Sequence, residues 1–194
     1  IRTIDIAPLV REGDNEVLLR FDYRPDMELE DAYLMGEFGV GRRGQAATPG
    51  AMTLVAPSDR LFLGSWVGQG LDFYGGAVRY RVPLGGLRRK RGQRVRVRLP
   101  GVNCTAAVVH AGTESFVLPW APFEADITDV LGKDADEIVV EVIGGRKNIL
   151  GPLHTPWEKW TGPAQFNPDN ALWREEYYLT DHGLTEPVIV EVLG

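Results

Sequence analysis

Glycine and proline interrupt this chain so often that short strands are favoured over long helices. The 194 residues include 23 Gly and 13 Pro, scattered rather than clustered. Between these breakers, apolar and polar residues alternate over strand-length runs, and no helix-length window carries a helical period. Short strands without helical crossovers predict an all-β protein, an antiparallel β-sandwich or barrel.

The strand candidates are short apolar runs rich in β-branched residues. They span 16–21, 77–82, 94–99, 105–109, 115–118, 137–142 and 187–193, with weaker candidates at 33–35 and 52–55. Short helical turns are expected near 128–131 and 172–175.

An internal repeat joins two distant parts of the chain. Asp5-Ile6 stands eleven residues before the run 16–21, and Asp126-Ile127 stands eleven residues before the run 137–142. The two segments align without a gap, and each has a turn in its middle. We interpret the repeat as a strand, a turn opened by the aspartate, and a second buried strand. Chance similarity between two amphipathic strands is the alternative.

The repeat sets the expected domain organisation. Residues 1–23 are the tail strands of a preceding sandwich or an N-terminal extension, and residues 24–194 form a β-sandwich with an irregular, Trp-rich segment at 144–186.

The chain starts at Ile1 rather than at a methionine. We therefore expect it to be a piece of a longer protein. Because Asp5 and Asp126 recur at the same place in both copies, we expect them to cap turns rather than to catalyse.

Composition and charge exclude several classes of protein. A hydrophobic share of 44% is too high for disorder, and one cysteine is too few for a disulfide scaffold. No apolar run is long enough for a membrane span, and a net charge of −6 argues against nucleic-acid and membrane partners. The segment 87–98 holds seven of the 21 basic residues, without interleaved aromatics. We expect a solvated strand face there.

The other chemical motifs in the sequence give little evidence for a function. Residues 39–44 spell G-x-G-x-x-G, but breakers rather than a helix follow, so we expect a flexible turn and no dinucleotide. Cys104 is expected to be a buried thiol, and the three histidines form no metal motif. We expect no cofactor. A structural calcium ion is compatible with a sandwich, although no acidic loop motif supports it.

Two stretches of the sequence resemble a known family. Residues 63–80, LGSWVGQGLDFYGGAVRY, resemble the W-x-x-Q-G-x-x-F-Y-x-G-x-x-x-Y signature of jelly-roll domains in large bacterial glycoside hydrolases. Residues 120–131 and 148–154 are similar to two further stretches of the same domains, P-(aromatic)-x-x-D-(aliphatic)-T-x-x-L and N-(aliphatic)-L-G-P-x-H. The resemblance covers about residues 60–155.

The resemblance implies a galactose-binding-like sandwich, of the type found beside family 2-like barrels and in rhamnosidase-like enzymes. Their catalytic carboxylates usually lie on a separate barrel, so none is assigned here, and this chain alone is expected not to be an enzyme. Carbohydrate and the catalytic domain of the same parent chain are the implied partners. Whether that bacterial parent is secreted, periplasmic or cytoplasmic stays open.

Aromatic residues in the predicted loops are the candidates for a sugar site. Sugar faces stack on flat rings while nearby polar groups bind the hydroxyls. The candidate carbohydrate-binding residues are His154, Trp157, Trp160, Trp66, Asp72 and Tyr74. Plugging the ends of the core is the alternative role of the rings, and it is favoured for Trp66, Tyr74 and Trp120.

Three functional hypotheses follow. The first is an accessory sandwich that binds or positions carbohydrate for a larger glycoside hydrolase. The second is a structural domain without a ligand, whose Trp-rich loops dock onto a catalytic domain. The third is a self-contained glycosidase or lyase with a carboxylate pair on the sandwich face.

Overall fold

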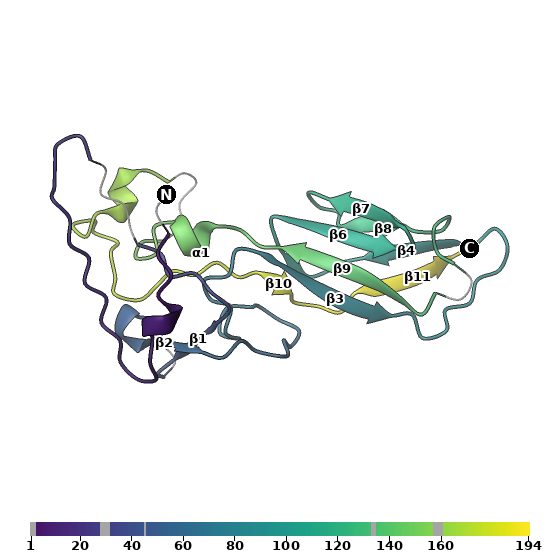
Figure 1. The fold of residues 1–194 in the computed structure, drawn as a ribbon. Coiled ribbons are helices and arrows are strands. Elements are labelled where there is room, and N and C mark those ends of the chain that lie inside the picture. Colours follow the sequence, from purple (N-terminus) through teal and green to yellow (C-terminus); the bar gives the residue numbers. More distant parts are fainter. Residues whose placement is uncertain (1–2, 28–31, 45, 133–134, 157–160) are drawn as a thin grey trace. The chain divides into compact units, whose positions relative to one another are not determined.

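The computed structural model describes residues 3–27, 32–44, 46–132, 135–156 and 161–194 (Figure 1). The chain divides into two units, Ile1–Gly36 and Glu37–Gly194, so the first unit extends beyond the expected boundary at residue 23. The first unit contains the 3-10 helix η1 (Ala7–Leu9) and, in its described residues, no strand. The strands expected at 16–21 and 33–35 are therefore wrong, because these apolar runs find no partner strand there.

The larger sheet of the second unit is antiparallel, with the strand order β3-β9-β6-β7. Its strands are β3 (Ala77–Pro83), β9 (Glu137–Ile143), β6 (Ala106–Ala111) and β7 (Glu114–Leu118). The strand β9 is central and pairs on both sides: Val140 lies opposite Tyr80 on β3 and opposite Val109 on β6.

The smaller sheet has the order β11-β4-β8, again antiparallel. Its strands are β4 (Arg94–Arg98), β8 (Glu124–Asp126) and β11 (Ile189–Leu193). Two short ladders pair β1 (Gly39–Arg42) with β2 (Met52–Val55), and β5 (Val102–Asn103) with β10 (Gly183–Leu184).

The remaining helices are short: η2 (Pro49–Ala51), α1 (Lys147–Leu150) and η3 (Pro163–Phe166). None of the helices in the described ranges is long and apolar enough to cross a membrane.

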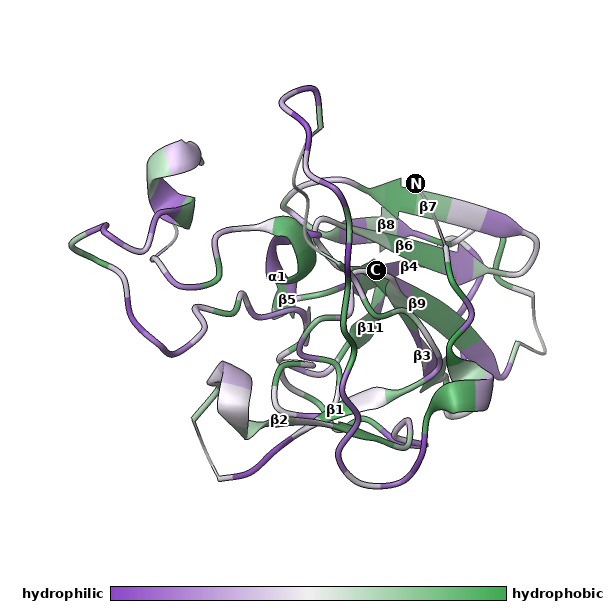
Figure 2. Cartoon of the chain, turned by 60° about the vertical axis from the view of Figure 1, so that its left-hand side comes forward, coloured by the Kyte–Doolittle hydropathy of each residue, from purple (hydrophilic) through white to green (hydrophobic). Residues whose placement is uncertain are grey.

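The two sheets share one hydrophobic core, which makes the second unit a β-sandwich. Alternate residues of β4, Val95 and Val97, are fully buried, and the arginines between them point outward. The facing sheet contributes the buried side chains of β6 and β9, and both sets belong to a single cluster. Figure 2 shows the hydrophobic colour along much of β6 and β9. The all-β sandwich expected from the sequence is confirmed.

Most of the expected strands of the second unit form, with ends displaced by a residue or two. Four strands lie outside the expected ranges: β5, β8, β10 and β1, and of these Gly39–Arg42 (β1) was expected to be a turn. Glycine is required there by close packing rather than by flexibility: a Cβ on Gly41 would lie 2.8 Å from Cγ1 of Val55 on β2. Glycine lowers the strand propensity of such a segment, which explains why the sequence did not reveal it.

Carboxylates of the neighbouring strands neutralise the basic face of β4. Arg96 lies between two of them, with its Nη2 2.8 Å from Oε1 of Glu191 on β11 and its Nη1 3.2 Å from Oε2 of Glu124 on β8. Arg94 pairs with Asp126. The outward-facing arginines of this strand are thus engaged within the sheet, as expected for a solvated strand face.

Asp126 caps the turn that follows β8. Its Oδ1 accepts a hydrogen bond from the backbone N–H of Thr128 at 3.0 Å, and its Oδ2 accepts one from Nε of Arg94 at 2.7 Å. The hydrogen bonds from Thr128, and then that from Arg94, lower the pKa of Asp126 to about 2. The capping role expected for this aspartate is confirmed.

Replacing Asp126 by Asn should change the pH dependence of stability. Because the folded state lowers the pKa of Asp126, its contribution is full above the unfolded pKa, near 3.8, and is lost as the pH falls toward 2. The difference in unfolding free energy between wild type and Asp126→Asn, measured with urea, should therefore be present at pH 6 and shrink between pH 4 and 2. A difference that is constant with pH would contradict this role.

Candidate functional site

The structure describes four of the six residues expected to bind carbohydrate. Trp157 and Trp160 lie outside the described residues. Trp66, Asp72 and Tyr74 belong to the loop that precedes β3, and His154 belongs to the irregular segment after α1. The structure gives these four residues different roles.

Trp66 is a core residue. Only 1% of its surface is exposed, and its Nε1 donates a hydrogen bond to the hydroxyl of Tyr80 at 2.6 Å. Its indole packs so closely on Gly144 and Gly183 that a Cβ on either would lie 3.0 Å or less from the ring. The ring faces are covered, so Trp66 cannot serve as a stacking surface for a sugar, and its proposed binding role is replaced by core packing.

Tyr74 is partly exposed and fixed by its own loop. Its hydroxyl donates a hydrogen bond to the carbonyl of Ala77 at 3.1 Å, and its ring contacts Trp66 edge-on at 6.0 Å between centroids. The phenol lies over Gly76, where any Cβ would collide with it. The ring is 39% exposed, so part of it faces solvent.

Asp72 is a buried carboxylate with incomplete pairing. Its side chain is fully buried, and its Oδ1 forms an ion pair with Nη2 of Arg42, whose side chain is 21% exposed. The backbone N–H of Gly68 donates to the same oxygen at 3.2 Å. Oδ2 of Asp72 and Nε of Arg42 are both buried without a hydrogen-bond partner among the described residues. Buried polar atoms of this kind are normally satisfied, so these two mark unused binding capacity.

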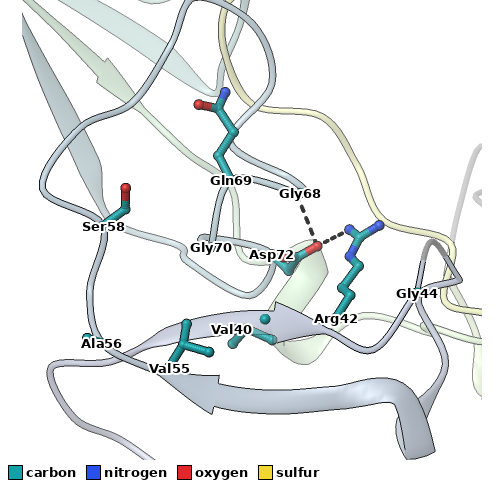
Figure 3. Close-up of a pocket in the computed structure, with 11 residues that line it drawn as sticks. Val40, Arg42, Gly44, Val55, Ala56, Ser58, Gly68, Gln69, Gly70 and Asp72 are labelled. Atoms are coloured by element: carbon teal, nitrogen blue, oxygen red, sulfur yellow. Dashed lines mark hydrogen bonds and ion pairs between the residues drawn. The ribbon is translucent and has the colours of Figure 1, made fainter.

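A pocket of about 530 Å³ surrounds this ion pair. The hairpin β1–β2 forms one wall and the loop 68–72 forms the other (Figure 3). Gly68 and Gly70 have positive φ angles of 84° and 91°, which favour glycine at these points of the loop. The side chain of Gln69 is engaged within the loop, where its Nε2 donates to the carbonyl of Ser65 at 2.6 Å. Within the described lining, the ion pair is therefore the part that holds buried side-chain polar atoms without a partner.

An aromatic cluster contacts the two segments that carry the pocket walls, although its rings are not among the lining residues. His154 stacks on Trp173 with ring centroids 4.3 Å apart, and Tyr177 contacts both His154, at 4.9 Å, and Phe73, at 5.5 Å. Phe73 directly follows Asp72 in the sequence. The backbone N–H of Tyr177 also donates to the carbonyl of Ala47, at 2.7 Å, in the loop between β1 and β2. The Trp-rich segment is thus attached to both walls of the pocket.

Asn148 in α1 connects the backbone of Asp72 to the backbone of Thr180. Its side-chain amide donates to the carbonyls of Asp72, at 3.1 Å, and Thr180, at 2.9 Å, and its Oδ1 accepts from the N–H of Thr180 at 2.8 Å. Asn148 is 1% exposed. All of its polar atoms have backbone partners, so it serves to join the two segments rather than to bind a ligand.

His182 is a second buried polar group near the loop. Its Nε2 accepts a hydrogen bond from the N–H of Gly145 at 3.2 Å, which places the proton of the neutral ring on Nδ1. Burial lowers the pKa of His182, which keeps the ring neutral at pH 7. Its Nδ1 has no partner among the described residues.

The sequence analysis missed Arg42, Trp173 and Tyr177. Arg42 stands inside the G-x-G-x-x-G stretch, and only the register of β1 brings it to Asp72. Trp173 is one of the five tryptophans of the chain, but nothing in its spacing indicates that it stacks on His154. Contacts between residues this far apart in sequence have no local signal.

A polar network crosses the outer face of the larger sheet. Oγ of Ser115 lies 2.8 Å from Nδ1 of His110, and Nε2 of His110 lies 3.1 Å from Oε2 of Glu141. The hydrogen bonds from Arg79 and then His110 lower the pKa of Glu141. Because Arg79 shares this carboxylate, at 2.8 Å, we interpret the group as a cross-strand network. The described ranges hold no cluster of three or more His, Cys, Asp or Glu residues that could bind a metal ion.

Comparison with known proteins gives a partial structural likeness. No family model and no curated protein matches the chain. Among solved structures, the chain is similar to part of an FMN-binding beta-glucuronidase from Facaelibacterium prausnitzii L2-6, a glycoside hydrolase, with 16% identity and a TM-score of 0.37. The match covers 79% of this chain and 22% of that one, so this chain spans about a fifth of the length of the enzyme.

Removing Arg42 should destabilise the second unit. Arg42→Ala leaves the Asp72 carboxylate buried without its counter-charge, which should lower the unfolding free energy by about 2–4 kcal/mol in urea denaturation. Arg43→Ala is the matched control, because that neighbouring side chain is exposed and should change stability by less than about 0.5 kcal/mol. Equal effects of the two substitutions would show that the ion pair is not structural.

The same substitution should destabilise the protein much more at Trp66 than at Trp120. Trp66→Phe removes a buried hydrogen bond and part of a buried ring, and should cost about 2–3 kcal/mol of unfolding free energy. Trp120 is 74% exposed, so Trp120→Phe should cost less than about 0.5 kcal/mol. Urea unfolding followed by circular dichroism measures both. A small cost at Trp66 would contradict its place in the core.

Proposed function

We propose that this chain is a non-catalytic accessory β-sandwich of a larger glycoside hydrolase and that it binds or positions carbohydrate. The site is the pocket around Arg42 and Asp72, together with the adjoining aromatic cluster. The observation that carries this proposal is the buried ion pair, which retains an unpaired acceptor on Asp72 and an unpaired donor on Arg42 at the lining of a pocket.

The chemistry of this pair suits a sugar hydroxyl. A hydroxyl group both donates and accepts hydrogen bonds, so one ligand hydroxyl can serve a carboxylate oxygen and a guanidinium N–H together. Such bonds to charged groups are about twice as strong as neutral ones. Arg42 is the partly exposed member of the pair. We infer that a small displacement of its side chain opens Oδ2 of Asp72 to the ligand.

The aromatic cluster supports the proposal from the other side. Trp173 and His154 are partly buried and lie on the segment attached to both pocket walls. Rings beside polar groups are the usual combination in sugar sites. Trp157 and Trp160, in the same segment of the sequence, remain candidates for the same role.

A structural role without a ligand is the second candidate, and one observation favours it. Val117 on the edge strand β7 is 65% exposed and the nearby Trp120 is 74% exposed. Large exposed apolar side chains at the edge of a sheet mark docking surfaces in many proteins. In this hypothesis the sandwich supports a catalytic domain of the parent protein.

A binding assay with matched variants tests the proposal. The probes are soluble cello-, xylo-, manno- and galacto-oligosaccharides, titrated into the chain by calorimetry. Asp72→Asn should weaken binding about tenfold, or about 1.4 kcal/mol, because it removes one charged acceptor. Trp173→Ala should weaken it further. Asp59→Asn is the control, because this exposed carboxylate lies next to Ser58 of the pocket lining.

Trp157→Ala and Trp160→Ala extend the assay to the remaining candidates. Loss of binding with retained circular dichroism and unfolding would support their role, and unchanged affinity would remove them from the site. Trp120→Ala is a further control, because this residue belongs to the docking hypothesis and its loss should leave oligosaccharide affinity unchanged. An absence of binding to every probe would contradict the carbohydrate proposal.

A further inference from the structure

The internal repeat extends from sequence to hydrogen bonding. In the second unit, the backbone N–H of Thr128 donates to Oδ1 of Asp126 at 3.0 Å, and in the first unit the N–H of Ala7 donates to Oδ1 of Asp5 at the same distance. These two pairs occupy equivalent positions in the repeat. Each aspartate therefore opens its turn in the same way.

The next bonds of the two turns also match. The carbonyl of Ile127 accepts from the N–H groups of Val130, at 3.3 Å, and Leu131, at 3.0 Å. The carbonyl of Ile6 accepts from those of Leu9, at 2.9 Å, and Val10, at 3.2 Å. All of these residues are equivalent in the gapless alignment. Chance similarity between two amphipathic strands does not account for matching bonds in the turn that precedes them.

Every buried core position described in the second copy is apolar in the first. Among the described residues of 124–143, the buried members of the core are Ala125, Ile127, Leu131, Ile138, Val140 and Val142. Their equivalents in the first unit are Ile4, Ile6, Val10, Val17, Leu19 and Phe21. Five of these six are exposed, from 51% at Val10 to 68% at Val17, and Ile6 is partly exposed. The first copy thus carries core side chains without a core.

The turn before this apolar run is already formed. Asn15 closes it: its Oδ1 accepts from the N–H of Arg11 at 3.0 Å, and its Nδ2 donates to the carbonyls of Arg11, at 2.7 Å, and Gly13, at 2.9 Å. Gly13 has a φ of 93°, as such a turn requires. The segment is therefore shaped locally, and only the partners of its strand are missing from the described residues.

From these observations we propose that residues 3–22 are the closing turn and strand of a second β-sandwich. The partner is a sheet with the architecture of β3, β6 and their facing sheet, formed by chain that precedes Thr3 in the natural protein. Residues 16–22 insert between two strands of that sheet and run antiparallel to both, as β9 does between β3 and β6. This inference uses no residue of the carbohydrate site and is independent of the proposed function.

The proposal fixes which face of residues 16–22 is buried. Leu19 is equivalent to the buried Val140 and should point into the second core, and Leu18 is equivalent to the partly exposed Val139 and should point outward. Both leucines are exposed here, at 56% and 68%. Leu18→Asp is therefore a matched control for Leu19→Asp, because the two differ only in the face that they occupy.

The test is hydrogen–deuterium exchange on the protein isolated from the cells that make it, and on its Leu18→Asp and Leu19→Asp variants. In the wild type, the amides of residues 17–21 should exchange slowly, like those of β9. Leu19→Asp should accelerate them on the order of a hundredfold or more, with little change at Leu18→Asp. Acceleration confined to 17–21 in the Leu19 variant would support the proposal, since β9 reports separately that the second unit stays folded. Fast exchange in the wild type, or equal effects of the two variants, would overturn it.

Discussion

The second unit depends on the double pairing of its central strand. β9 is hydrogen-bonded to β3 on one side and β6 on the other, and it buries Ile138, Val140 and Val142 against the smaller sheet. A strand in this position takes part in two hydrogen-bonded ladders and also contributes side chains to the core. The backbone then continues through Gly144, whose N–H donates to the carbonyl of Gly76 at 2.9 Å. The end of β9 therefore also fixes the loop that carries Asp72.

The candidate site follows from this attachment. Trp66 packs against Gly144 and fills the end of the core, so the loop it belongs to cannot move freely. Asn148, four residues further on, binds the carbonyl of Asp72. The carboxylate is thus held by segments that are distant in sequence, and its pairing with Arg42 is left incomplete. Buried polar atoms are normally hydrogen-bonded, so this incomplete pairing is the feature on which the proposed site depends.

Sequence patterns predicted the fold better than the site. Alternation in Arg94–Arg98 and in Glu137–Ile143 reports burial directly, so these strands were predictable. The run 16–21 has the same pattern but no partner strand among the described residues. Periodicity shows which face of a segment could be buried, and it does not show whether a partner strand is present. Asp72 was a candidate from the sequence, whereas its partner Arg42 was not, since the pairing depends on the register of β1. Core packing was the favoured role for both Trp66 and Trp120, yet Trp66 is 1% exposed and Trp120 is 74% exposed, because the order of residues does not tell a core ring from an exposed one.

Chemical-shift mapping would test the central claim most directly. Amide resonances of the isotopically labelled chain would be followed while each soluble oligosaccharide is added. Carbohydrate binding at the proposed site predicts saturable shifts at Arg42, in the loop 68–73 and at Trp173, with β7 and Trp120 unchanged. Shifts centred on β7, or no saturable shift with any oligosaccharide, would contradict the account.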